Sequence, residues 1–146
     1  MPLAAEPPVA QVAAASRLDR ALVREINTTR ARRGQHPLVL TTRLRRLARH
    51  HTLDMLRHDN FSHDGDGTTF SQRVRARVHY RKVGETLALM PRAASARRIV
   101  AAWLRSPSHR AVLLDASYRR IGVCGAKGRM GSRRAFVVTA DFSTWR

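Results

Sequence analysis

One histidine stands at a corner from which it could do chemistry. His109 follows Pro107, directly after a stretch (99–104) whose apolar side chains recur at helical spacing. Because proline disfavours helix at the residue before it, we expect the helix to stop there and His109 to lie on a turn. An imidazole fixed at such a corner could be aimed at a cleft, to bind a ligand or accept a proton. The alternative is that His109 only hydrogen-bonds within its own corner.

An acid in an apolar setting is a second candidate. Glu85 is the one carboxylate between Tyr80 and Leu89, and it is followed by a run of mostly apolar residues. A buried carboxylate needs a partner or a shifted pKa, so burial of Glu85 would indicate a site in which other groups are arranged around it. The alternative is an exposed carboxylate at the edge of a strand.

A third group has the spacing of metal ligands on a helix. His50, Asp54 and His58 recur every four residues and could hold a metal ion. Successive steps of four residues drift around a helix, and such stripes are also found on ordinary polar faces. His51 lies on the apolar face of the same predicted helix, where a hydrogen-bonded core histidine is expected.

Composition limits the class of protein and its partners. The 146 residues suit one domain with a real core, and 43% of them are hydrophobic. The net charge of +18 favours anionic partners such as nucleic acid, envelope polymers or acidic lipid, unless the arginine excess only reflects genomic base composition. Nucleic acid is disfavoured because the few aromatic residues lie mostly in core-like runs rather than among basic residues.

Cysteine usage and the ends of the chain bear on location. Cys124 is the single cysteine, so no internal disulfide forms, and its apolar strand-like surroundings predict a buried, inert thiol. No stretch approaches the roughly 20 apolar residues of a membrane span. The first residues lack the basic and apolar regions of a signal peptide, so the protein is either cytoplasmic or has lost a leader.

The predicted elements surround these candidates with helices first and a hairpin last. We expect a disordered arm over residues 1–15 and a single domain over 16–146, whose first helix starts in a capping box of Ser16 and Asp19. The predicted elements are a helix to about Arg33, ended by Gly34; an extended piece at 38–40; a helix capped by Thr41 or Thr42; a loop at 59–69; a short helix at 70–76; a helix at 93–105; and strands at 119–126 and 135–142, joined by a loop at 127–134.

Three separated motifs, taken together, resemble a known family. They are Phe61-Ser62-His63; Val83-Gly84-Glu85-Thr86-Leu87-Ala88; and Trp103-x-x-Ser106-Pro107-x-His109-Arg110 followed by Tyr118-x-x-Ile121-Gly122-Val123. In this order and spacing they resemble the bacterial branch of the CAP superfamily, the cysteine-rich secretory, antigen 5 and pathogenesis-related 1 proteins, also called SCP-like. The resemblance covers roughly residues 16 to 144.

The resemblance implies a fold and a set of site residues. The implied fold is α+β, an α-β-α sandwich with a small, mainly antiparallel sheet between helical layers. His63 and His109 match the two histidines of the family's cleft, which often carry a divalent metal, and Glu85 matches its first acid. Ser106 stands where many members have a second glutamate, so the set of two histidines and two acids is incomplete here.

The chemistry of this set follows from its residue types. Two neutral imidazoles and a carboxylate could form a facial set for zinc with open positions for water. Glu85 could instead hold the tautomer of one histidine and leave its other nitrogen to bind or to accept a proton. Zinc at His63 and His109 should be weakly bound and lost at acid pH, and the fold should survive chelation.

We therefore expect a secreted or cell-envelope binding module, monomeric and without a transmembrane segment. Its cleft would hold a small ligand or a divalent metal, and its charge would suit an anionic cell-wall polymer or lipid. The alternative is a hydrolase that uses His63, Glu85 and His109 with a metal or as acid and base, on envelope polymers or peptides. Nucleic-acid binding, from charge alone, is a third interpretation.

Overall fold

The protein folds into helices on both faces of one sheet. The computed structural model describes residues 9–65, 67–76 and 79–145. Its helices are α1 (Val9–Ala31), α2 (Thr42–His58), α3 (Phe70–Arg75), α4 (Ala96–Arg105) and α5 (Pro107–Leu113). Its strands are β1 (Val39–Leu40), β2 (Val83–Met90), β3 (Arg120–Met130) and β4 (Arg133–Ser143).

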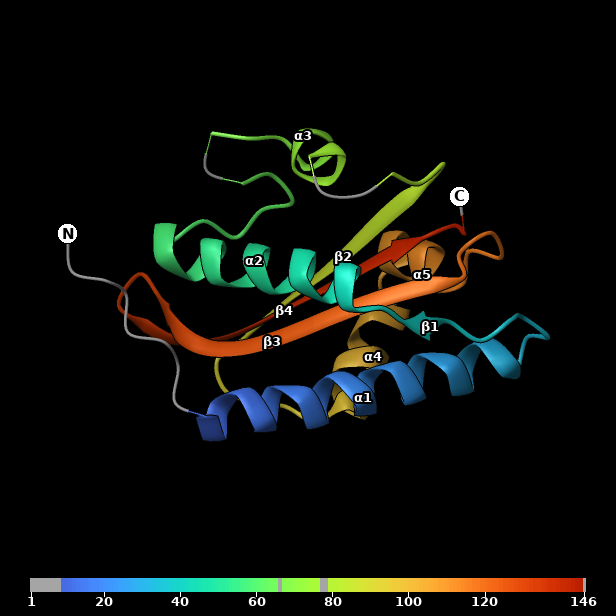
Figure 1. The fold of residues 1–146 in the computed structure, drawn as a ribbon. Coiled ribbons are helices and arrows are strands. Elements are labelled where there is room, and N and C mark those ends of the chain that lie inside the picture. The colour runs from blue at the N-terminus through green and yellow to red at the C-terminus, as the bar shows by residue number, and fades with distance from the viewer. Residues whose placement is uncertain (1–8, 66, 77–78, 146) are drawn as a thin grey trace.

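The sheet has the order β1-β3-β4-β2 and is antiparallel except for the short parallel pair β1 and β3. Helix α2 packs on β3 and β4 from one side, while α1 and α4 pack against each other on the opposite side (Figure 1). Helix α5 packs against α4 and contacts β2. This arrangement confirms the predicted α-β-α sandwich with a small, mainly antiparallel sheet.

Helix α2 forms where its apolar period predicts. Thr41 is its N-cap, and the Thr41 hydroxyl accepts a hydrogen bond from the Leu44 backbone N–H. The face that packs on the sheet is the predicted one: Leu44, Leu47, Ala48, His51 and Met55 are all buried. Gly122 on β3 lets the helix approach closely, because a Cβ there would overlap the backbone of Leu44 and Arg45.

The expected start of the first helix is wrong. Helix α1 begins at Val9, not at Ser16, so residues 9–15 belong to a helix rather than to a disordered arm. Four of these seven residues are alanine, the strongest helix former, which explains the extension. Asp19 is therefore not part of a capping box, and its buried carboxylate accepts a hydrogen bond from Arg45 Nε at 3.0 Å. Residues 1–8 lie outside the described residues.

The corner at Pro107 also differs from the expectation. His109 lies inside the short helix α5 rather than on a turn, because Pro107 occupies the first turn of a new helix, where a missing N–H costs nothing. The preceding helix α4 does end where predicted, at Arg105. Trp103 fastens α4 to the sheet by donating its indole N–H to the Leu87 carbonyl at 2.9 Å.

The closing hairpin is longer than predicted. Strands β3 and β4 continue through the stretch expected to be a loop and pair as far as Met130 with Arg133. Only Gly131 and Ser132 form the turn, with Gly131 at a positive φ of 62°. Within the described part of the chain, no helix is long and apolar enough to cross a bilayer.

Candidate functional site

Strand β2 is an edge strand, and its one acid faces an acid on the neighbouring strand. Glu85 on β2 lies directly opposite Asp141 on β4, so both side chains point to the face covered by α2. Glu85 is 6% exposed and Asp141 1% exposed. The alternative of an exposed edge carboxylate at Glu85 is therefore wrong.

Glu85 is held by two side chains that come from the segment after α2. His63 Nδ1 lies 3.0 Å from Glu85 Oε1. Arg73 on α3 donates to both Glu85 oxygens, at 3.2 Å and 2.9 Å, and to the His63 carbonyl at 2.8 Å. Arg73 thus joins the loop that carries His63 to the edge strand, which orders both members of the pair.

The pKa values of the two adjacent acids shift in opposite directions. Burial disfavours ionisation of Glu85, but the hydrogen bond from His63 and the charge of Arg73 hold the pKa of Glu85 below its ordinary value. Burial and the neighbouring Glu85 charge raise the pKa of Asp141 well above its ordinary value. The contacts with the Arg73 cation and the His63 imidazole favour the ionised form of Glu85, whereas burial beside the Glu85 charge favours the protonated form of Asp141.

His63 is oriented by Glu85 and open to solvent. Its hydrogen bond to Glu85 is the main cause of a raised His63 pKa, with burial acting against it. With Nδ1–H donated to the carboxylate, Nε2 is the basic nitrogen, and it makes no hydrogen bond to any described residue. The side chain is 52% exposed, so this nitrogen can meet a ligand from solution.

His109 lies on α5, the helix that contacts the edge strand β2. Burial lowers the pKa of His109, and the charge of His63 lowers it further, which places the two imidazoles within electrostatic reach of each other. His109 is half-buried and makes no hydrogen bond to the described part of the chain. Ser106 caps the start of α5, and its hydroxyl lies 3.3 Å from that of Ser108, so it adds no charge to the site.

Sequence reasoning missed three members of this cluster. Asp141 is one, because only the pairing of β2 with β4 brings it beside Glu85. Arg73 is another, and nothing local separates it from the many other arginines of the chain. His51 was expected in the core and is fully buried there, but its Nε2 bonds the Ser62 carbonyl at 2.7 Å and lies 3.7 Å from Glu85 Oε1.

The donor set limits how a metal could be held. Among the described residues, no three His, Cys, Asp or Glu side chains are arranged to hold a metal ion, which applies to the main site and to the α2 stripe alike. Glu85 is occupied by Arg73 and His63, so its geometry is that of an orienting carboxylate rather than a ligand. On the α2 stripe, His58 Nδ1 lies 2.9 Å from Asp54 Oδ1.

The sequence matches a known family over most of its length. The family model of CAP, described as the cysteine-rich secretory protein family, matches residues 23–142. This span includes His63, Glu85 and His109. Among proteins with curated functions, none matches the sequence significantly.

Solved structures share the fold at low sequence identity. An outer surface protein of Borrelia burgdorferi is 24% identical with a TM-score of 0.70, and the match covers 86% of this chain and 91% of that one. An extracellular protein of Bacillus anthracis with an SCP domain is 23% identical with a TM-score of 0.75, over 97% of this chain and 45% of that one. A cysteine-rich secretory protein of Staphylococcus aureus is 18% identical with a TM-score of 0.72, over 96% and 41%. The chain thus spans less than half of the last two proteins.

Proposed function

Because the chain belongs to the cysteine-rich secretory protein (CAP) family, we propose that it is a binding module whose His63–Glu85–His109 site takes a divalent metal ion or a small ligand. The observation that carries the proposal is the hydrogen bond of 3.0 Å between His63 Nδ1 and the buried Glu85 carboxylate. It fixes one tautomer of a half-exposed histidine and presents a basic nitrogen to solvent. An imidazole oriented by a carboxylate in this way is a common arrangement for a metal ligand.

Two imidazoles fit a weakly bound ion. His63 and His109 would supply the ligands, Glu85 would orient His63, and Arg73 would keep Glu85 ionised. A bound zinc ion would supply a Lewis acid with open positions for water or a ligand. Because two protein ligands are fewer than the four of a structural zinc site, removal of the ion should leave the fold intact.

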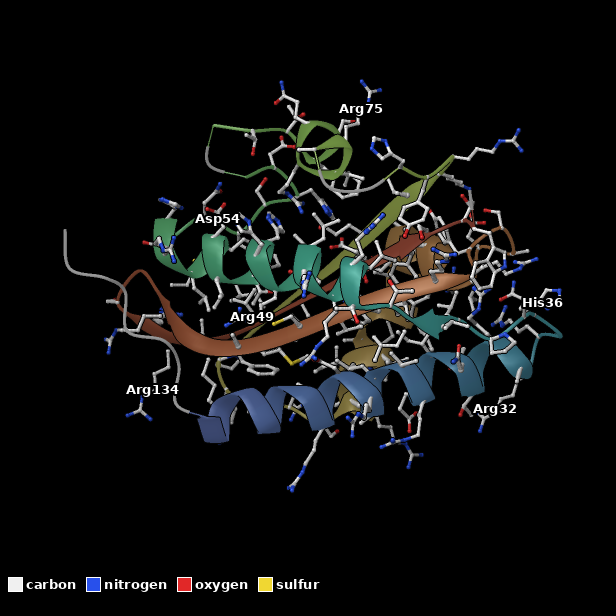
Figure 2. The ribbon with its side chains drawn as sticks, viewed as in Figure 1. Arg32, His36, Arg49, Asp54, Arg75 and Arg134 are labelled. Carbon is white, nitrogen blue, oxygen red and sulfur yellow. The ribbon has the colours of Figure 1, made fainter. Side chains whose placement is uncertain are left out.

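The place of action is proposed to be outside the cell or in the cell envelope. Two of the structural neighbours are described as an outer surface protein and an extracellular protein. The net charge of +18 supports an anionic cell-wall polymer or lipid as a partner. Arginine side chains project from several faces of the molecule, including Arg32, Arg49, Arg75 and Arg134 (Figure 2).

The test is calorimetric titration of zinc into the protein and four variants: His63→Ala, His109→Ala, His36→Ala and His58→Ala. His63→Ala and His109→Ala should each weaken binding at least about tenfold, since each removes one of two protein ligands. The control is His36→Ala, which removes an exposed imidazole at the far end of α1. Thermal melts should give the same Tm with and without chelator.

Two results would contradict the proposal. Unchanged zinc binding in both His63→Ala and His109→Ala would place the ion elsewhere, and a loss in His58→Ala would place it on the α2 stripe. Collapse of the fold in chelator would make the metal structural.

A second candidate function, hydrolysis, is favoured by the same hydrogen bond. A histidine whose Nδ1–H is held by a carboxylate can act as a general base through Nε2. Asp141 does not complete a reacting carboxylate pair, because it is 1% exposed and out of reach of a substrate. Release of product from peptide or envelope-polymer substrates that His63→Ala abolishes and His36→Ala preserves would favour the hydrolase.

A further inference from the structure

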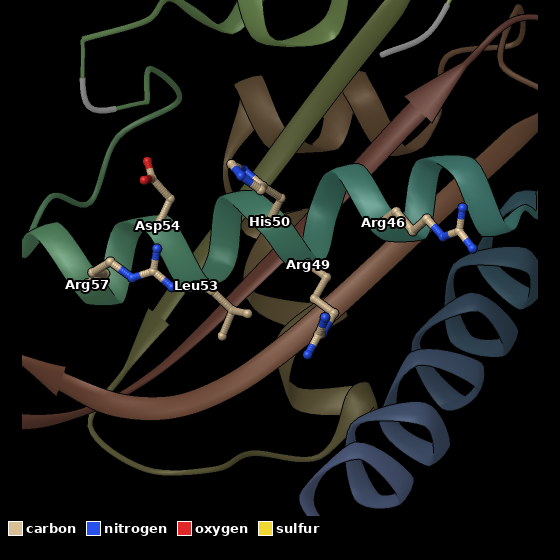
Figure 3. A pocket seen from close by; sticks show the side chains of 6 residues that line it. All are labelled: Arg46, Arg49, His50, Leu53, Asp54 and Arg57. Carbon is tan, nitrogen blue, oxygen red and sulfur yellow. The ribbon is translucent and has the colours of Figure 1, made fainter. Parts of the chain in front are cut away.

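The outward face of α2 carries a row of arginines around a pocket. Arg46, Arg49 and Arg57 line a pocket of about 360 Å³ together with His50, Leu53 and Asp54. Figure 3 shows Arg46 and Arg57 at the two ends of this row and Arg49 between them. We call these three residues the α2 arginine face.

The helix period sets this geometry. The residues that alternate with the arginine face are buried against the sheet, so the arginines can only point outward. At 3.6 residues per turn, Arg46 and Arg57 are three turns apart and lie on nearly the same side, about 16 Å from each other along the axis. Arg49 lies between them, rotated by about 60° around the helix axis, so the face is elongated rather than a compact cluster.

The charges on this face are available to a partner. In the described part of the chain no carboxylate pairs with Arg46, Arg49 or Arg57, whereas the neighbouring Arg45 is paired with Asp19. All three are exposed. Asp54 is the one acid that lines the pocket, and its Oδ1 lies 2.9 Å from His58 Nδ1. The balance along the face is strongly positive.

We propose that the α2 arginine face binds a linear polymer of phosphodiester-linked units through its phosphate groups. Guanidinium groups match phosphate oxygens with two parallel hydrogen bonds, which favours phosphate over a diffuse negative charge. One phosphate cannot reach arginines about 16 Å apart, so the row requires several phosphates on one chain. The phosphodiester backbone of a polyol polymer supplies charges at regular intervals along a line.

The residues of the α2 arginine face disfavour two other anionic partners, a membrane surface and nucleic acid. A membrane-binding helix inserts exposed apolar side chains, and the exposed large hydrophobic residues among those described all lie off α2. Nucleic-acid bases are gripped by aromatic side chains, and none lines this pocket. This proposal rests on the proposed function in one respect: a location in the cell envelope would bring the protein into contact with such a polymer. It does not involve the His63–Glu85–His109 site.

The test compares two triple variants of equal charge. The first is Arg46→Gln, Arg49→Gln and Arg57→Gln. The matched control is Arg92→Gln, Arg97→Gln and Arg98→Gln, which removes exposed arginines on or beside α4, across the sheet. Binding of a fluorescent glycerol-phosphate oligomer of about ten units is measured by anisotropy over a range of salt concentrations.

The face variant should lose at least about tenfold in affinity, and the control less than about threefold. The slope of log Kd against log salt should fall by about 2 in the face variant, because about 0.7 counterion is released per phosphate contact on a single strand. His63→Ala should bind the oligomer as the wild type does, so failure here and failure of the proposed site are distinguishable. Melting temperatures check that both triples fold, and Arg46→Gln and Arg57→Gln alone replace the face variant if it does not.

Three results would overturn the proposal. Equal losses in the two triples would show that only net charge matters. Equal binding of a sulfated polysaccharide of the same charge density would show that phosphate is not recognised. Tighter binding to vesicles of phosphatidylglycerol or to duplex DNA, lost in the face variant, would assign the face to a membrane or to nucleic acid.

Discussion

The two buried acids should respond in opposite ways to removal of their charge. Glu85→Gln leaves the Arg73 guanidinium, whose side chain is 5% exposed, without a counter-ion. Breaking a buried ion pair from one side costs about 3–5 kcal/mol of unfolding free energy. Asp141→Asn should cost less than about 1 kcal/mol near pH 4, because an amide there replaces a carboxyl whose protonated form is favoured by burial.

The pH dependence separates the two acids further. Asp141 binds its proton more tightly when folded, so its contribution to stability falls as pH rises above its ordinary pKa of 3.8. Asp141→Asn has no proton to lose at this position. Its free energy of unfolding should therefore rise relative to that of the wild type by up to about 1.4 kcal/mol per pH unit, until the pH passes the raised pKa of Asp141. Glu85 has a lowered pKa, so its contribution is present above 4.5 and is lost as pH falls through the lowered value.

The assay is urea unfolding of the wild type and both variants between pH 4 and 8, with chelator present so that no metal competes. The expected order of stability at pH 7 places Asp141→Asn at or above the wild type and Glu85→Gln far below it. A larger loss in Asp141→Asn than in Glu85→Gln would refute the assignment of the charge to Glu85. Equal pH profiles for the wild type and Asp141→Asn would refute the protonated state of Asp141.

Three further outcomes follow from packing and burial. Burial raises the pKa of Cys124 to about 12, so a thiol reagent should label the native protein far more slowly than the protein in guanidinium, and rapid native labelling would contradict this. Gly122→Ala should cost about 3 kcal/mol or more in urea unfolding, because its Cβ meets the α2 backbone, whereas Gly128→Ala meets only the Leu56 side chain and should cost less. Burial raises the pKa of Asp19 to about 6 against the pull of Arg45, so lowering pH from 7 to 5 should stabilise the wild type by about 1–2 kcal/mol relative to Asp19→Asn; no difference would show that Asp19 titrates normally.

Much of the fold and part of the site could be predicted from the sequence. The apolar period of α2 and its Thr41 cap are local signals, and the structure shows both. The ordered motifs that carry His63, Glu85 and His109 identified the family and the α-β-α sandwich. Local signals were misread at the alanine-rich start of α1 and at the helix that Pro107 begins, because alanine and N-terminal proline both favour helix. They were also misread at 127–134, where the strands of the hairpin continue through the predicted loop.

Only the tertiary structure decided how the site is charged. The pairing of Glu85 with Asp141 depends on which strand lies beside β2 and in which register, and that choice is made by the packing of the whole sheet. The same packing selects Arg73 from a chain full of arginines and gives it to Glu85. A residue's type fixes the chemistry that it can do, whereas its charge state depends on burial and on neighbours distant in sequence, which no local pattern encodes.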